Sequence, residues 1–237
     1  SVDLAIGLVG YIALFLGLMK VVEEAGGLAF MARLIRPVLV RLFPDVPEDH
    51  PAMGAMVMNI AANALGLGNA ATPFGLKAMK ELNDLNTEKG TATNAMVLFL
   101  AINTSGLALL PTGIIGLRAL KGSVDAAAIF PTTLLATAVS TVVGILAAIG
   151  LSRLPFFART APRPAEPIER KPMDPLALIP FGVAMGLLVA LVTVVYTHGE
   201  KASQWIMPAL IFGMLAIGVI RKVRVYEVFV AGAKEGF

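Results

Sequence analysis

Cysteine is absent from this sequence, and histidine is nearly so, with only His50 and His198. Without cysteine there are no disulfides, no thiolate metal sites and no cysteine nucleophiles. Two histidines in separate loops do not make a metal site of ordinary spacing, so we expect neither a metal nor another cofactor. Charge is scarce too, because 15% of the residues are charged, whereas a soluble domain carries roughly a quarter. The formal net charge of +3 gives no support to nucleic-acid binding.

The few charges leave long uncharged windows between them. Most of these windows reach the roughly 17 to 25 residues that a membrane-spanning helix needs. A soluble protein with buried helices would show polar stripes at helical spacing, which the windows lack. We therefore predict an all-α integral membrane protein, a multi-pass helical bundle with broken or re-entrant helices and one interfacial amphipathic helix. The windows are residues 4–19, 51–76, 90–117, 126–152, 175–197 and 202–220.

Basic residues indicate how the helices are oriented. In residues 28–43 a helical wheel places the apolar side chains on one arc and Arg33, Arg36 and Arg41 on the opposite arc. This is the pattern of a helix that lies at a membrane surface. The proline-rich stretch 153–174 is also basic, and basic loops favour the cytoplasmic face, so we expect both segments there.

The same charges predict an order of crossings and a division of the chain. A helix over 124–151 should run from outside to inside, 175–197 should cross outward and 203–220 should return. The first window, 4–19, is expected to be a retained membrane helix and not a signal peptide, because no basic region precedes it. We divide the chain into a membrane domain over 1–152, a cytoplasmic linker over 153–174 and the start of a second membrane half over 175–237.

The window 51–76 begins with a helix that has one small, polar side. Pro51 suits the first position of a helix over 51–65, with Asp49 or His50 as its cap. Asn59 and Asn63 are spaced four residues apart and therefore share one face of that helix.

A polar break should follow. Gly66 to Asn69 favour a turn, and Thr72 before Pro73 predicts the start of a second short helix over 73–82. Two half-helices that meet at a polar break are the pattern of a re-entrant hairpin. Because hydrocarbon cannot satisfy the backbone groups of such a break, it must face protein or a wet cavity.

A second polar break is predicted further along the chain. A helix over 91–104 reaches the polar run Asn103 to Ser105, and Pro111 to Gly113 follow. If the preceding hairpin enters and leaves on the cytoplasmic side, a single broken crossing at 91–121 agrees with the orientation that the basic residues predict for the neighbouring helices. That crossing would put Gly122 outside.

The chemistry available at these breaks is neutral and polar. No carboxylate lies in any of the uncharged windows, so catalysis has no titratable group at depth and we do not expect an enzyme. Asparagine, threonine and serine can bind an uncharged or zwitterionic solute through hydrogen bonds. The candidate solute-binding residues are Asn59, Asn63, Gly68, Asn69, Thr72, Asn103, Thr104 and Ser105.

Two functions fit these residues. One is a transporter-like protein, whose partners are the lipid bilayer and an unidentified small polar solute. The other is a structural membrane protein, in which the asparagines join helices and the breaks form an interface with a second copy or with the chain's own second half. Solute-lining asparagines should point into a water-accessible cavity, whereas scaffold asparagines should be paired and dry.

Several longer motifs stand out: Gly17 to Lys20, Glu23 to Gly26, Leu42 to Met53, Asn59 to Asn63, Gly66 to Met79, Asn103 to Ser105 and Pro111-Thr112. Together they resemble a known family. The residues similar to spore maturation protein A extend over roughly 4–150, and residues 225–237 look like the opening of spore maturation protein B, so the chain resembles a fused form whose second half is incomplete. The resemblance implies the nucleoside-recognition, or Gate, group of membrane domains, with solute movement or gating in a bacterial plasma membrane. Nucleoside permeases carry threonine and glutamate where this tip has Ala70 and Ala71, so nucleoside transport is not implied.

Overall fold

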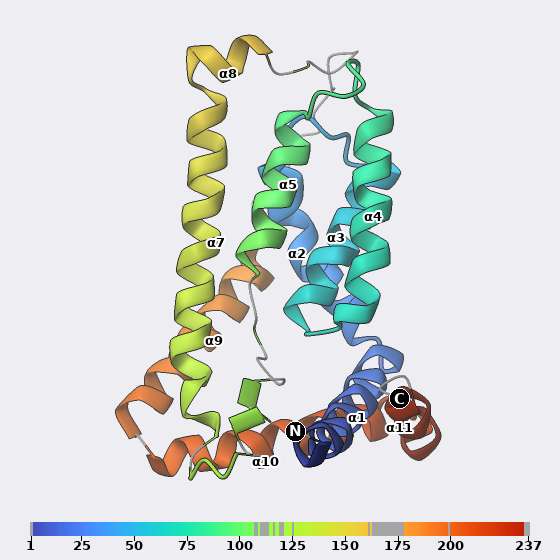
Figure 1. The fold of residues 1–237 in the computed structure, drawn as a ribbon, viewed down its shortest axis with the longest axis vertical. Helices are drawn as coiled ribbons and strands as arrows, with labels where there is room; N and C mark the ends of the chain where they lie inside the picture. The colour runs from blue at the N-terminus through green and yellow to red at the C-terminus, as the bar shows by residue number, and fades with distance from the viewer. Residues whose placement is uncertain are drawn as a thin grey trace.

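The chain folds into helices, as expected. The computed structural model describes residues 2–106, 121–124, 126–160, 178–198 and 200–234, with isolated positions 109, 114, 115, 117, 118 and 162, and no strand occurs among them (Figure 1). The helices are α1 (Val2–Glu24), α2 (Gly27–Leu42), α3 (Pro51–Ala64), α4 (Gly68–Asp84), α5 (Asn94–Ser105), a 3-10 turn η1 (Ala127–Ile129), α7 (Phe130–Ser152), α8 (Pro155–Thr160), α9 (Ile179–His198), α10 (Glu200–Ile220) and α11 (Val225–Lys234).

Helices α3 and α4 form a hairpin, with α4 at the edge of the bundle opposite α7 (Figure 1). His50, one of the two predicted caps, caps α3, because its Nδ1 accepts a hydrogen bond from the Ala52 backbone N–H at 3.1 Å, and Pro51 occupies the first turn. The chain reverses over residues 65–67, where Gly66 has a φ of 76° that favours glycine. The predicted polar turn is therefore present, but it is shorter than the sequence indicated.

The expected start of the second half-helix was wrong. Helix α4 begins at Gly68, so Thr72 and Pro73 lie inside it and not at its cap. The Ala71 backbone N–H donates to the Leu67 carbonyl at 2.9 Å, which starts the helix five residues before the position that the Thr-Pro pair predicted. Pro73 removes only one backbone donor, the one that would reach the Asn69 carbonyl, so the helix continues through it.

Helices α5 and α7 also begin later than predicted. Thr93 caps α5, with its Oγ1 accepting from the Met96 N–H at 3.2 Å, so the helix starts at Asn94 and not at 91. Asn103 to Ser105 form its last turn and are not part of a break, and Pro111 to Gly113 lie outside the described residues. A 3-10 turn over Ala127–Ile129 precedes α7, which begins at Phe130 and not at the predicted residue 124.

The C-terminal part differs from the sequence prediction in two places. The first residues of the predicted linker are helical, as α8, while 163–177 lie outside the described residues. Helix α10 begins at Glu200, three residues before the predicted start at 203. The proposed division into three segments stays a prediction.

Helix α11 packs closely against α1. A Cβ on Gly232 would lie 2.5 Å from the Lys20 Cβ and 2.7 Å from the Leu16 carbonyl oxygen, and a Cβ on Gly17 would lie 2.8 Å from the Phe229 carbonyl oxygen. Only glycine allows this separation of the two helices. The C-terminal segment therefore contacts the first helix directly.

Helix α2 has the amphipathic pattern that its sequence predicts. Its buried side chains recur at helical spacing, from Leu28 to Leu39, and the helix packs against α3. Arg33, Arg36 and Arg41 are exposed. Its position at a membrane surface stays a prediction.

Helix α7 has the composition and exposure of a membrane span. It is the one helix in the described part of the chain that is long and apolar enough to cross a membrane, and 11% of its apolar window is buried. A core helix of a soluble protein would be mostly buried. Its exposed apolar residues include Leu135, Val139, Val142, Val143 and Leu146.

Candidate solute-binding pocket

Helices α3, α4 and α5 line an open pocket of about 260 Å³. Half of the eight predicted site residues line it, and none of its lining side chains carries a charge. An uncharged pocket suits an uncharged or zwitterionic solute better than an ion, because a buried ion requires a compensating charge. The lining residues are Asn59, Asn63, Ala71, Thr72, Gly75, Leu76, Met79, Phe99, Leu100 and Asn103.

Asn59 is the most buried polar residue of the pocket, with 3% of its surface exposed. Its Nδ2 donates to the Ala71 carbonyl at 2.8 Å, which links α3 to the first turns of α4. Gly75 makes this contact possible, since a Cβ there would lie 2.9 Å from the Asn59 Nδ2.

The other end of the Asn59 amide has no partner. Its Oδ1 is buried and accepts no hydrogen bond from any described residue. The orientation of the amide follows from the network, because the Ala71 carbonyl can only accept and the nitrogen must face it. A buried polar atom left unsatisfied costs about 1–3 kcal/mol. The Asn59 Oδ1 is therefore a buried acceptor without a described partner, on a side chain that lines the pocket.

Asn63 and Asn103 are paired across the pocket. The Asn63 Nδ2 donates to the Asn103 Oδ1 at 3.1 Å, and the Asn103 Nδ2 donates to the Phe99 carbonyl within α5 at 2.9 Å. Each amide nitrogen carries two hydrogens, so each retains one for a solute. The pair both joins α3 to α5 and leaves donors for the pocket.

The remaining predicted site residues have other surroundings. Thr72 is exposed on α4 and lines the pocket. Thr104 donates back to the Leu100 carbonyl at 3.0 Å, and Ser105 donates to the Thr141 Oγ1 of α7 at 3.0 Å. The Thr104 bond lies within α5. The Ser105 bond joins α5 to α7, as the scaffold alternative expects. Gly68 and Asn69 form the start of α4, and the Asn69 side chain lies outside the described side chains.

The apolar part of the lining was not predicted. Gly75 lies three residues after Thr72 on α4, and Phe99 lies four residues before Asn103 on α5, so helical spacing could have found both. Leu76, Met79 and Leu100 carry no polar signal, and their place in the wall depends on how the three helices pack.

Comparison with known proteins identifies the family. A family model described as "Nucleoside recognition", the Gate domain, matches residues 5–121, which contain the entire pocket. The chain is 42% identical to spore maturation protein A of Bacillus subtilis (strain 168) over 146 residues, which make up 62% of this chain and 74% of that protein. The chain belongs to the spore maturation protein A family. No solved structure matches it.

Membership in the spore maturation protein A family confirms the resemblance to that family, while the likeness of residues 225–237 to spore maturation protein B stays a prediction. Together with the exposed apolar surface of α7, it identifies a membrane protein. Among the described side chains, no group of three histidine, aspartate or glutamate residues is positioned to hold a metal ion.

Proposed function

We propose that this protein binds a small uncharged or zwitterionic solute in the pocket between α3, α4 and α5, as a transporter-like protein of the bacterial plasma membrane. The observation that carries this proposal is the Asn59 Oδ1, a buried acceptor without a partner at the wall of a 260 Å³ pocket. The volume lies just below the roughly 300 Å³ at which typical ligand pockets begin, so the solute is small.

The hydrogen-bonding groups of the pocket define the solute further. The solute presents an N–H or O–H donor to the Asn59 Oδ1, and acceptors to the spare amide hydrogens of Asn63 and Asn103. An anionic solute would place negative charge beside the Asn59 Oδ1 without a nearby cation, because no charged side chain lines the pocket. Nucleosides have donors and acceptors of this kind, as do other neutral polar metabolites.

The arrangement of the helices supports a re-entrant hairpin. In Figure 1, α3 begins and α4 ends at the end of the bundle where α2 and α7 also end. Arg41 and Arg153 lie at that same end. Basic residues favour the cytoplasmic face, so the hairpin enters and leaves from the cytoplasm while α5 and α7 cross. Alternation of access then requires movement around the hairpin tip, where Gly66 has a positive φ.

The structural alternative is supported by different contacts. The Asn63–Asn103 pair and the Ser105–Thr141 pair join neighbouring helices whether or not a solute binds. The unpartnered Asn59 Oδ1 distinguishes the two functions, because a scaffold gains nothing from a buried atom that costs free energy.

A ligand screen on the full chain tests the proposal. Wild type, Asn59→Leu and a control, Asn83→Leu, are unfolded thermally in the presence of neutral and zwitterionic solutes, nucleosides among them. Asn83 is half-buried on α4 and does not line the pocket. A bound solute raises the unfolding midpoint as its concentration rises. We expect that shift in wild type and Asn83→Leu and not in Asn59→Leu.

The Asn59→Leu variant should fold, which keeps the screen interpretable. Leucine has a similar branched shape, and it removes both the 2.8 Å hydrogen bond and the unsatisfied Oδ1. Loss of the hydrogen bond lowers the free energy of unfolding by about 1 kcal/mol, whereas removal of the unsatisfied Oδ1 raises it by about 1–3 kcal/mol. The two effects therefore largely cancel. If no solute shifts the wild-type midpoint, or if Asn59→Leu keeps the shift, the solute pocket is wrong.

A further inference from the structure

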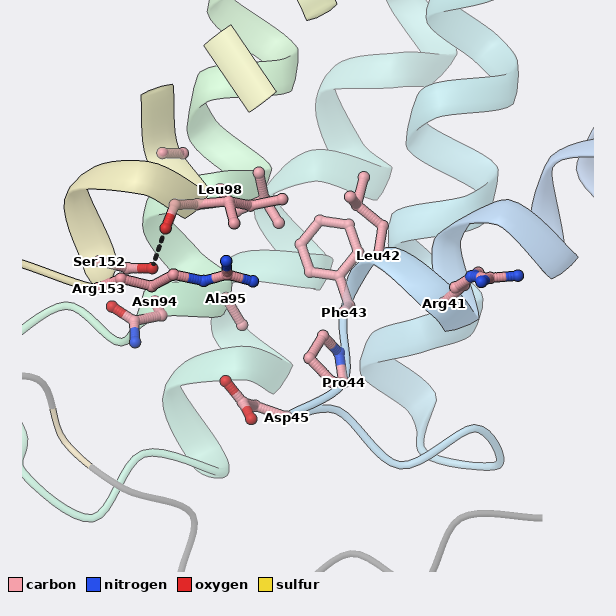
Figure 2. A pocket seen from close by; sticks show the side chains of 12 residues that line it. Arg41, Leu42, Phe43, Pro44, Asp45, Asn94, Ala95, Leu98, Ser152 and Arg153 are labelled. Carbon is pink, nitrogen blue, oxygen red and sulfur yellow. Dashed lines mark hydrogen bonds between the residues drawn. The ribbon is translucent and has the colours of Figure 1, made fainter. Parts of the chain in front are cut away.

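A second pocket, of about 280 Å³, lies at the end of the bundle where α2 ends, α5 begins and α7 ends. It shares no residue with the solute pocket. Figure 2 shows polar groups on one side of it and an apolar wall on the other. The lining residues are Arg41, Leu42, Phe43, Pro44, Asp45, Asn94, Ala95, Leu98, Ala148, Ile149, Ser152 and Arg153.

The charged groups of this pocket are not paired with one another. Arg153 and Asp45 both line it, yet no ion pair joins either of them to a described residue. In Figure 2 the Arg153 side chain extends beside Asn94 and Ser152 toward Phe43, whereas the Arg41 side chain points away. The pocket therefore offers a guanidinium, an amide and a carboxylate that are not paired with one another.

The depth of the pocket in a membrane follows from α7. This helix is apolar and exposed until Ser152, and Arg153 is the first charged residue after it. Helix α8 then exposes the rings of Phe156 and Phe157 by 75% and 45%. Apolar rings next to a basic residue at the end of a span are found where the hydrocarbon meets the headgroups. The second pocket therefore lies at headgroup depth.

We propose that the second pocket binds the headgroup of one phospholipid, with the Arg153 guanidinium on the phosphate. Guanidinium binds phosphate oxygens through paired hydrogen bonds. Asp45, across the pocket, favours a headgroup that also carries an amine, such as phosphoethanolamine, over one that carries only hydroxyls. The apolar wall of Leu98 and Ile149 contacts the upper part of an acyl chain. Basic pockets between helices at the cytoplasmic surface are suited to this use.

Native mass spectrometry of the delipidated full chain tests the site. The protein is titrated with phosphatidylethanolamine, with phosphatidylglycerol, and with glycerophosphoethanolamine, which has the same headgroup without acyl chains. We expect one saturable lipid adduct, tighter for phosphatidylethanolamine than for phosphatidylglycerol. Arg153→Gln should weaken it by about tenfold, as expected for loss of a hydrogen bond to a charged group. Arg153→Lys, which keeps the charge and loses the paired geometry, should weaken it less.

Two further variants separate the site from general lipid attraction. Arg33→Gln removes an exposed arginine of α2 that does not line the pocket, and it should leave the affinity unchanged. Asp45→Asn should abolish the preference for the amine headgroup. Equal losses in Arg153→Gln and Arg33→Gln would overturn the proposal, because only surface attraction would remain. Displacement of the lipid by glycerophosphoethanolamine at equal concentration would overturn it too, since a soluble phosphate ester would then be the ligand.

Discussion

Gly75→Ala is the substitution that examines the pocket wall most closely. Gly75 lies in the middle of α4, and a Cβ there would lie 2.9 Å from the Asn59 Nδ2 and 3.6 Å from its Cγ. Such a contact is closer than carbon and nitrogen tolerate, so the Asn59 amide must move away. Movement lengthens its 2.8 Å hydrogen bond to the Ala71 carbonyl and shifts the Oδ1 to which we assign the solute donor.

Two effects of Gly75→Ala oppose each other in the free protein. Alanine in a helix interior is favoured over glycine by about 0.8–1 kcal/mol. Loss of the Asn59 hydrogen bond costs about 0.5–1.5 kcal/mol. We therefore expect the free energy of unfolding to stay within about 1 kcal/mol of wild type, while solute affinity falls.

Gly54→Ala is the matched control for Gly75→Ala. Gly54 lies on α3 of the same hairpin, and an added Cβ would meet nothing within 4 Å. It should raise the free energy of unfolding, by up to about 1 kcal/mol, and leave solute affinity unchanged. Denaturant titration in micelles measures the first quantity and the solute-induced thermal shift the second. If Gly75→Ala stabilised the protein as much as Gly54→Ala and kept the thermal shift, the reasoning about Asn59 would be refuted.

Two other predictions concern the helix contacts and the topology. In a double-mutant cycle, we expect a coupling of about 1 kcal/mol between Asn63→Ala and Asn103→Ala in the free energy of unfolding. A coupling of zero would mean that the 3.1 Å hydrogen bond between the two asparagines does not form. The sequence has no cysteine, so single-cysteine variants report one site each. Val124 is 95% exposed, and we expect Val124→Cys to be labelled only from outside in intact cells. Leu154→Cys should be labelled only from inside. Labelling of both variants from the same side would contradict the crossing by α7.

Local signals in the sequence predicted the beginning of the hairpin well. A proline after His50 fixes the backbone for a first helical turn, and the imidazole supplies the cap, so both could be found without knowing the fold. The turn at Gly66 was also predictable, since few other residues adopt a positive φ easily. The shared face of Asn59 and Asn63 followed from helical periodicity.

The parts that could not be predicted depend on contacts distant in sequence. Thr72 and Pro73 have the local pattern of a helix start, but the Asn59 side chain, twelve residues away, holds Ala71 within a helix that has already begun. The pairing of Asn63 with Asn103 joins residues forty positions apart. Composition indicates that such asparagines need partners, and only packing determines which partners they have.

The most direct test of the solute pocket is whether water reaches it. Leu100 lines the pocket and is 54% exposed, while Val97 on the same helix is 47% exposed and does not line it. Val97 lies nearer the start of α5, so depth in the membrane alone would favour its reaction. Thiols react as thiolates, which form only in water. In lipid vesicles, we expect a water-soluble thiol reagent to modify Leu100→Cys faster than Val97→Cys; slower reaction at Leu100→Cys, or none at either, would contradict a solute pocket.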